Sequence, residues 1–250
     1  EQIDMFLDNQ SKPPLILWSG GIDSTYMLWK QAQKYQRLYT KYIEVENNTN
    51  KTILELHARK QIKNLLQDKC HVTIVDDTST SFIIRGNSVD QFQQFAYAAF
   101  SSITLPKNSS NLILFGYNKD DLITSEKMYH NFVQLFKYAH KFWDVDQENS
   151  IQAGFPLKYK TKADIINEMV ESDLGEKLLL ETWVCEYEKT WLECPEKELC
   201  QKCETLNQLS KSTKLSNKAK KLLKYKLNEW QPRYRDKVLE DFETDELKYN

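Results

Sequence analysis

The chain has 250 residues, of which 40% are apolar and 28% are charged, and its formal net charge is −2. This composition is ordinary for a globular protein, and it lacks the strongly basic balance that favours nucleic acid as a partner. No apolar run approaches the roughly 18–20 residues that a membrane-spanning helix needs. Residues 1–14 are polar and acidic and do not resemble a signal peptide. We therefore expect a cytoplasmic protein with no membrane partner.

Short apolar runs alternate with segments of helical spacing along the first two thirds of the chain. Buried strands are expected at residues 15–18, 38–45, 71–75 and 112–115. Helices are expected at residues 25–35, 53–66, 92–100, 128–142 and 163–169. Strands that alternate with helices predict an α/β fold with a doubly wound parallel sheet. We expect this domain to span residues 1–180, followed by a small helical region at residues 181–250.

A glycine-containing loop, Ser19-Gly20-Gly21-Ile22-Asp23-Ser24, follows the first predicted strand and opens the first predicted helix. The first turn of a helix has free backbone N–H groups and a partial positive charge, which suit an anion. Glycine lets the backbone approach phosphate oxygens because it has no Cβ. The chain has neither a Walker A motif nor a three-glycine dinucleotide fingerprint. The loop therefore predicts phosphate binding, and a tight turn capped by Ser24 or Asp23 is the alternative.

Four of the five cysteines lie close together in the last third of the chain, at Cys185, Cys194, Cys200 and Cys203. Four thiolates are enough for a closed tetrahedral zinc site, which would be structural because no coordination position stays open. Free thiols are the alternative interpretation. Cys70 stands apart beside an apolar run, and we expect it to be a buried and inert thiol.

The glycine loop resembles the Ser-Gly-Gly-x-Asp-Ser loop of the PP-loop ATP pyrophosphatase superfamily. Three further segments and the cysteines follow it in an order that resembles the 7-cyano-7-deazaguanine synthase family over residues 13–210. These segments are Gly116 with Asp120 and Asp121, Pro156-Leu157 with Lys162-Ala163-Asp164-Ile165, and Thr182-Trp183-Val184-Cys185.

The resemblance implies an ATP-dependent carbon–nitrogen ligase. Enzymes of this family adenylate 7-carboxy-7-deazaguanine and let ammonia displace AMP to form an amide. They then adenylate the amide and expel AMP to form the nitrile. They use ATP and Mg²⁺, bind a structural Zn²⁺ through four cysteines and commonly form homodimers.

By position, the resemblance assigns catalytic roles to Asp23, Ser24 and Lys162. It assigns binding of ATP and its Mg²⁺ to Ser19, Gly20, Gly21, Asp23, Ser24, Thr25 and Gly116. It assigns binding of Zn²⁺ to Cys185, Cys194, Cys200 and Cys203. A solvated lysine at a helix start remains the alternative for Lys162. For Asp120 and Asp121, a role with Mg²⁺ or substrate and a role as a helix cap both stay open.

The sequence departs from the family pattern at two places. Residues 47–51 read Asn47-Asn48-Thr49-Asn50-Lys51 where the family usually has an Arg-His pair, and five residues rather than two separate Cys194 from Cys200. Both departures fall where the substrate pocket or the zinc loop would form, so they affect the acceptor more than the adenylation step.

Three other functions therefore stay open. In the first, the enzyme adenylates a deazaguanine or another carboxylate and joins it to a protein or nucleic acid, in modification or antiviral defence. A tRNA-thiolating enzyme is a weaker option, because its sulfur-carrying cysteine would have to be free. A non-catalytic, zinc-stabilised nucleotide-binding module is the third.

The basic stretch from Lys211 to Lys224 is expected to be a solvated helix, with RNA contact as the alternative.

Overall fold

The computed structural model describes residues 12–45, 49–82, 105–121, 134, 152–185 and 200–246. The helices expected at residues 92–100 and 128–142 lie outside these ranges, and so does Cys194, apart from the single helical residue at 134. Within the described ranges, every helix is either too short or too polar to cross a lipid bilayer.

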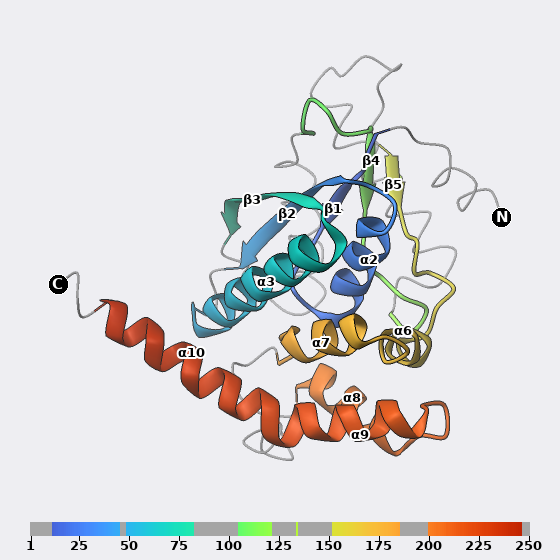
Figure 1. Cartoon of the computed structure of the whole chain (residues 1–250), viewed down its shortest axis with the longest axis vertical. Coiled ribbons are helices and arrows are strands. Elements are labelled where there is room, and N and C mark those ends of the chain that lie inside the picture. The colour runs from blue at the N-terminus through green and yellow to red at the C-terminus, as the bar shows by residue number, and fades with distance from the viewer. Residues whose placement is uncertain are drawn as a thin grey trace. The chain divides into compact units, whose positions relative to one another are not determined.

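The central element is a parallel sheet of five strands (Figure 1). The strands are β1 (Leu15–Leu17), β2 (Arg37–Val45), β3 (Thr73–Phe82), β4 (Leu112–Leu114) and β5 (Gln152–Gly154). Their order is β3-β2-β1-β4-β5, and all neighbouring strands run parallel. The predicted α/β class with a parallel sheet is therefore confirmed. The fifth strand, β5, was not predicted.

The middle strand, β1, connects the two halves of the sheet. Leu15 pairs with Tyr39 of β2 on one side and with Ile113 of β4 on the other. The chain moves outward from β1 to β2 and β3, and later returns to the other side of β1 as β4 and β5. This reversal places a topological switch point between the carboxyl ends of β1 and β4, where open α/β sheets bind their ligands.

The strands in the middle of the sheet are more deeply buried than the edge strand. Leu15 and Ile16 of β1 are buried, as are all three residues of β4. In β3, Ile74 is buried whereas Val75 is 45% exposed, which is the alternation of a strand that has solvent on one face. This difference explains why β1 and β4 have uninterrupted apolar sequences, whereas β3 has a polar one.

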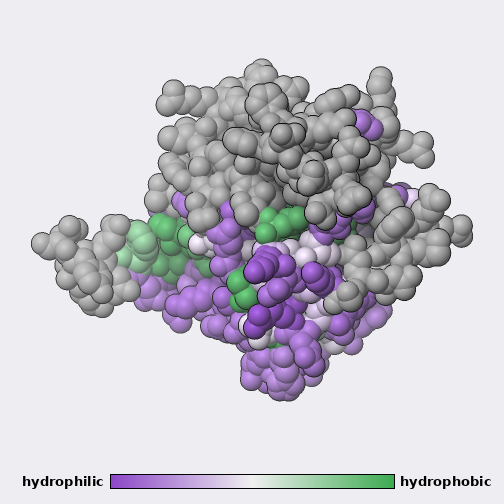
Figure 2. Space-filling model, turned by 90° about the horizontal axis from the view of Figure 1, so that it is seen from above, coloured by the Kyte–Doolittle hydropathy of each residue, from purple (hydrophilic) through white to green (hydrophobic). Residues whose placement is uncertain are grey.

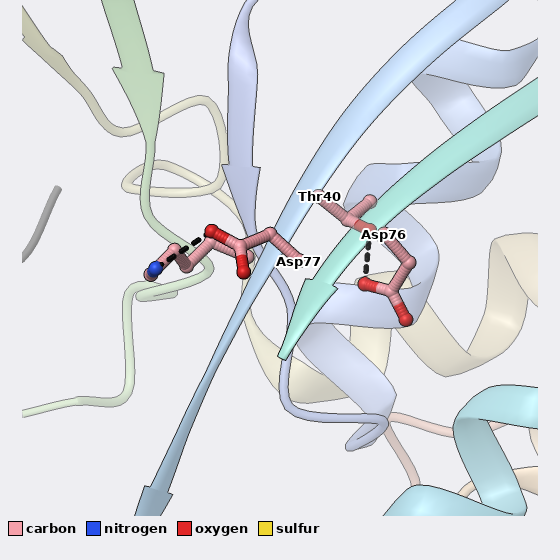
Figure 3. A network of polar contacts seen from close by, with 4 residues as sticks. Thr40, Asp76 and Asp77 are labelled. Carbon is pink, nitrogen blue, oxygen red and sulfur yellow. Dashed lines mark hydrogen bonds and ion pairs between the residues drawn. The ribbon is translucent and has the colours of Figure 1, made fainter. Parts of the chain in front are cut away.

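Two polar contacts join β2 to the edge strand β3 (Figure 3). The Thr40 hydroxyl donates a hydrogen bond to Asp76 over 2.5 Å, and the Lys41 ammonium forms a 2.7 Å ion pair with Asp77. Asp76 and Asp77 are consecutive, so their side chains point to opposite faces of the sheet. Lys41 is buried, and its ion pair with Asp77 compensates a charge that would otherwise be costly inside the protein.

The helices follow the strands in the predicted alternation and then continue alone. They are α2 (Ile22–Ala32), α3 (Thr49–Cys70), α6 (Lys162–Met169), α7 (Asp173–Glu181), α8 (Gln201–Lys211), α9 (Asn217–Tyr225) and α10 (Gln231–Glu246). A π-helical turn, Lys226–Trp230, joins α9 to α10, so that the three form one continuous helix (Figure 1).

The chain divides into two compact units. The first contains the whole sheet, in the ranges Glu1–Ser19, Met27–Asn47 and Leu66–Lys162. The second consists of Gly20–Tyr26, Asn48–Leu65 and Ala163–Asn250, and it holds most of the helices. The domain boundary at residue 180 stays a prediction from the sequence.

Local signals in the sequence explain where the helices of the second unit begin. Ser172 accepts a hydrogen bond from the Gly175 amide at the start of α7, and Ser216 accepts one from Ala219 at the start of α9. A Cβ on Gly175 would lie 2.1 Å from the carbonyl oxygen of Met169, so the close approach of α7 to the end of α6 requires glycine.

On the face drawn in Figure 2, hydrophilic residues cover most of the described surface.

Candidate functional site

The loop that leaves β1 has the backbone conformation that its glycines suggest. The Trp18 amide donates a hydrogen bond to the Lys41 carbonyl and so fixes the end of the strand. Gly20 then has a φ of +82°, which L-amino acids other than glycine rarely adopt. Helix α2 begins two residues later, at Ile22. The loop therefore turns directly from the sheet into a helix N-terminus, as an anion site requires.

The predicted loop residues differ in how far they reach solvent. Ser19 is exposed, and Gly21 and Asp23 are half-buried. Ser24 and Thr25 are buried instead, and the Ser24 hydroxyl donates a 3.3 Å hydrogen bond to the Gly21 carbonyl. The accessible part of the loop thus consists of Ser19, Gly21 and Asp23, whereas Ser24 and Thr25 support its shape from inside.

Arg59 lies against this loop and was not singled out in the sequence. It belongs to α3, and its Cγ atom is 3.1 Å from the position that a Cβ on Gly20 would take. The Glu55 carbonyl is 3.3 Å from the same point. Arg59 is only 2% exposed, and arginine is almost never so deeply buried unless it is paired. Its position between the apolar residues Ala58 and Ile62 of an otherwise buried helix face was the available signal.

The segment that precedes the cysteines also contacts the glycine loop. Trp183 donates a 3.3 Å hydrogen bond from its backbone amide to the Gly20 carbonyl. Its indole nitrogen donates a 2.8 Å hydrogen bond to the Cys185 carbonyl. Trp183 is buried, so both bonds are shielded from water. The sequence singled out this segment and the loop separately, and the structure brings them into contact.

Helix α10 supports Trp183 from behind. The rings of Trp183 and Tyr234 stack with centroids 6.1 Å apart, and the Tyr234 hydroxyl is 2.8 Å from His57 Nδ1 on α3. Burial lowers the pKa of His57 below its ordinary value, and the nearby charge of Lys60 adds to this effect. Burial also raises the pKa of Tyr234. Both groups are therefore neutral near pH 7, and a neutral pair forms this hydrogen bond.

Three of the four cysteines proposed as metal ligands lie together. The sulfurs of Cys185, Cys200 and Cys203 are all within 4.8 Å of one another, and all three residues are buried. Hydrogen bonds in which the Cys203 thiol donates to the Cys185 and Cys200 sulfurs raise the pKa of Cys203, because a thiolate crowded by other sulfurs is unfavourable without a cation. Sulfurs in a tetrahedral zinc site lie about 3.8 Å apart, from a Zn–S distance of about 2.3 Å. The donor set and spacing fit a metal ion, and Cys194 lies outside the described residues.

A buried lysine, Lys226, binds backbone carbonyls just before Trp183 in the sequence. Lys226, in the π-helical turn, is 1% exposed, and its ammonium donates hydrogen bonds to the carbonyls of Leu180 at 2.7 Å and Thr182 at 2.5 Å. Burial lowers the pKa of Lys226 to about 7, against the opposing charge of Glu181. Burial raises the pKa of Glu181 in turn. The sequence analysis did not identify Lys226, because it follows a run of exposed lysines.

The predicted residues near the end of β4 form a separate polar cluster in the first unit. Asp121 accepts a 2.7 Å hydrogen bond from the Asn118 amide, and Asn118 accepts one of 2.7 Å from the Asp120 amide. Asp120 also accepts a 2.7 Å hydrogen bond from the amide of Lys162, the first residue of α6. Asp120 therefore caps the first turn of α6 from a distant loop, whereas Asp121 closes the turn that begins at Asn118. A role of either aspartate with Mg²⁺ or substrate stays a prediction. Gly116 is half-buried just before this cluster.

Comparisons with known proteins give a distant likeness to solved structures only. No family model matches the chain, and no curated protein matches it. Among solved structures, the chain is similar to the U34-tRNA thiolase NcsA from Methanococcus maripaludis with its [4Fe-4S] cluster. The TM-score is 0.43 and the identity 14%, over 92% of this chain and 72% of that chain.

Proposed function

We propose that the protein is an ATP-dependent enzyme that adenylates its substrate, with the glycine loop as the binding site for the pyrophosphate of ATP. The observation that carries this proposal is the left-handed Gly20 between the end of β1 and the N-terminus of α2. Such a loop presents backbone N–H groups to an anion, and a side chain at this position would strain the backbone and make tight contacts with α3. Ser19, Gly21 and Asp23 then face the nucleotide.

Arg59 and Asp23 have opposite charges and separate roles in this proposal. The Arg59 side chain lies against Gly20 at its Cγ atom, and its guanidinium is the proposed positive charge that offsets the charge on the departing pyrophosphate. Asp23 lies in the first turn of α2 and carries negative charge, so it suits the Mg²⁺ that accompanies ATP rather than the phosphates themselves. Ser24 and Thr25 hold the turn, and Lys162 is the proposed contact with nucleotide or substrate from the start of α6.

The proposed substrate is 7-carboxy-7-deazaguanine, on the strength of the resemblance in sequence. A carboxylate oxygen attacks the α-phosphorus of ATP, and the bond from that phosphorus to pyrophosphate breaks. Ammonia then attacks the acyl carbon and AMP leaves, which gives the amide and releases a proton. A second adenylation, on the amide oxygen, allows loss of AMP and formation of the nitrile. The enzyme accelerates these steps by orienting the reactants and stabilising charge.

Zn²⁺ is the proposed occupant of the cysteine cluster, with Cys194 as the fourth ligand. When bound, it would cross-link the segment at Cys185 to the start of α8 at Cys200 and Cys203. A zinc ion with four thiolate ligands has no open position for substrate. Its proposed contribution is therefore to structure, and the chemistry belongs to the loop.

The test is an incubation of the full chain with ATP, Mg²⁺, ammonia and 7-carboxy-7-deazaguanine. We expect pyrophosphate, AMP and 7-cyano-7-deazaguanine, identified by mass spectrometry. Asp23→Asn should lose AMP formation, whereas Asp68→Asn, an exposed aspartate on α3, should keep it. Failure of the wild type to bind ATP or form AMP would overturn the adenylation proposal. AMP formation without consumption of this acid would overturn only the substrate.

A second candidate keeps adenylation but transfers the activated group to a protein or nucleic acid. The observation in its favour is α9, which exposes Lys221 and Lys224, whereas Lys218 is paired with Glu176 of α7. The helix has no acidic residue in its first turn, so its exposed side is positively charged and suits an acidic macromolecule. Labelling with ATP and the radioactive acid in cell extract would reveal it, because label would then appear on a macromolecule instead of the free nitrile.

A further inference from the structure

Lys226 has an unusual position for a lysine. It lies in the π-helical turn between α9 and α10 and is 1% exposed. Burying an ammonium group costs free energy, so its hydrogen bonds have to compensate for the lost water. π-Helical turns are rare and frequently occur at functional sites, because they redirect a single side chain without breaking the helix. Here the side chain is directed at the end of α7.

The partners of Lys226 are two backbone carbonyls that a helix cannot satisfy by itself. Leu180 lies in the last turn of α7, and Thr182 is its C-cap residue. The last carbonyls of a helix lack intrahelical partners and carry partial negative charge. The ammonium of Lys226 binds both, at 2.7 and 2.5 Å. It therefore fixes the direction in which the chain leaves α7.

The residue that leaves α7 in this direction is the one that contacts the nucleotide loop. Trp183 follows Thr182 directly, and its amide donates the hydrogen bond to the Gly20 carbonyl. A peptide unit is planar, so fixing the Thr182 carbonyl also fixes the plane that contains the Trp183 amide. Lys226 and Gly20 are thus connected through a single rigid peptide group.

We propose that Lys226 is a positioning residue for the nucleotide loop, which orients the Thr182–Trp183 peptide so that it holds Gly20 in the conformation that binds pyrophosphate. The inference rests on the proposed function for its readout by ATP. It also makes the continuous helix formed by α9, the π-helical turn and α10 part of the nucleotide site, although this helix lies outside the segments that resemble the family.

The test compares Lys226→Met with wild type in the full chain. Methionine keeps the length and most of the volume of the side chain but donates no hydrogen bond. The matched control is Val238→Ala, which removes buried volume from α10 without touching the Thr182–Trp183 peptide. ATP affinity is measured by calorimetry with Mg²⁺, well below both melting temperatures. Hydrogen exchange of the Trp183 amide is measured in parallel, and the metal content of each variant is determined.

For Lys226→Met we expect at least tenfold weaker ATP binding and at least tenfold faster exchange of the Trp183 amide. For Val238→Ala we expect a lower melting temperature with both of these values close to wild type. Equal ATP affinity and equal amide exchange in Lys226→Met and wild type would overturn the inference. Equal losses in both variants would also overturn it, because the effect would then be general destabilisation.

Two further outcomes separate this inference from its neighbours. If ATP affinity of Lys226→Met returns on addition of zinc, Lys226 acts through the cysteine cluster and the inference is wrong. If wild type binds no ATP, the proposed function fails, and Trp183 exchange still reports whether Lys226 orders the loop. Should Lys226→Met not fold, Lys226→Leu, which also donates no hydrogen bond, gives the same comparison.

Discussion

The amide nitrogen of Trp183 lies 3.3 Å from the carbonyl oxygen of Gly20. This contact joins two segments that are far apart in the sequence, one with the left-handed Gly20 and the other with Cys185, the first of the three clustered cysteines. Because the Trp183 indole also binds the Cys185 carbonyl, the loop and the cluster share one buried residue. A change in either is therefore expected to affect the other.

Replacing Gly20 with alanine is expected to weaken ATP binding by roughly five- to thirtyfold. Alanine disfavours a φ of +82° by about 1–2 kcal/mol, and its Cβ would approach both Arg59 Cγ and the Glu55 carbonyl. Calorimetry with ATP and Mg²⁺ measures the loss, and a thermal melt shows whether the fold survives. Ala32→Gly, at the far end of the same helix, is the control and should bind ATP as wild type does. Unchanged affinity in Gly20→Ala would contradict the assignment of the loop.

Removing the positive charge of Arg59 is expected to weaken ATP binding at least tenfold. Arg59→Met keeps much of the buried volume but leaves no charge beside the loop, and a charge-assisted hydrogen bond to phosphate contributes about 1.5–3 kcal/mol. Lys60→Met removes a charge from the exposed side of the same helix and should have little effect. The two variants are compared by ATP titration, and equal affinities would show that Arg59 has a structural role only.

Removing the metal is expected to lower both stability and ATP affinity. Elemental analysis should find one zinc per chain in wild type and in Cys70→Ser, whose thiol lies outside the cluster. Cys203→Ser should lose the zinc, melt at a lower temperature and bind ATP more weakly, because the Cys185 segment also holds Trp183. If iron and acid-labile sulfide are found in place of zinc, the proposed identity of the metal is wrong, but the assignment of the cysteines as metal ligands stands.

Acidification is expected to destabilise the protein through His57. Its pKa is lowered in the folded state from the ordinary value of 6.5, first by burial and then by Lys60. The unfolded chain therefore binds the proton more readily than the folded chain. The stability that neutral His57 contributes is fully present above pH 6.5 and is lost as the pH falls through the lower, folded pKa.

Urea unfolding between pH 7.5 and 5 measures this effect. The free energy of unfolding should fall less steeply with acidification in His57→Gln than in wild type. His71→Asn is the control, because His71 is exposed and its φ of 53° suits asparagine. A pH dependence in His57→Gln identical to that of wild type would contradict the assigned cause.

The sequence predicted the parts of the fold in which local pattern and tertiary environment agree. β1, β2 and β4 lie inside the sheet, so their apolar runs were visible, and the glycine loop between β1 and α2 followed from them. β5 was missed because Gln152–Gly154 is short and has no apolar pattern. The polar end of β3 was missed because an edge strand tolerates Asp76, Asp77 and the hydroxyl residues beyond them.

Arg59 and Lys226, two buried cations of the second unit, were not identified from the sequence, for a different reason. Arg59 and Lys226 stand among other charged residues in the sequence, where a solvated side chain is the usual outcome. Their burial depends on helices that come together only in the folded chain. The apolar neighbours Ala58 and Ile62 were the one local signal for Arg59, and no local pattern marks Lys226. In contrast, the clustering of Cys185, Cys200 and Cys203 was predictable, because their chemistry already required proximity.

The position of the short central strand β1 limits the order in which its strand pairs can form during synthesis. β1 needs both of its neighbours to be enclosed, yet Leu15 pairs with Ile113, which the ribosome adds much later. Until β4 has emerged, a nascent chain can offer β1 only the partner on its β2 side. The loop after β1 therefore acquires its second flank late in synthesis, and non-local parallel pairing of this kind is slow to form. A fragment that ends before Leu112 would leave one edge of β1 open.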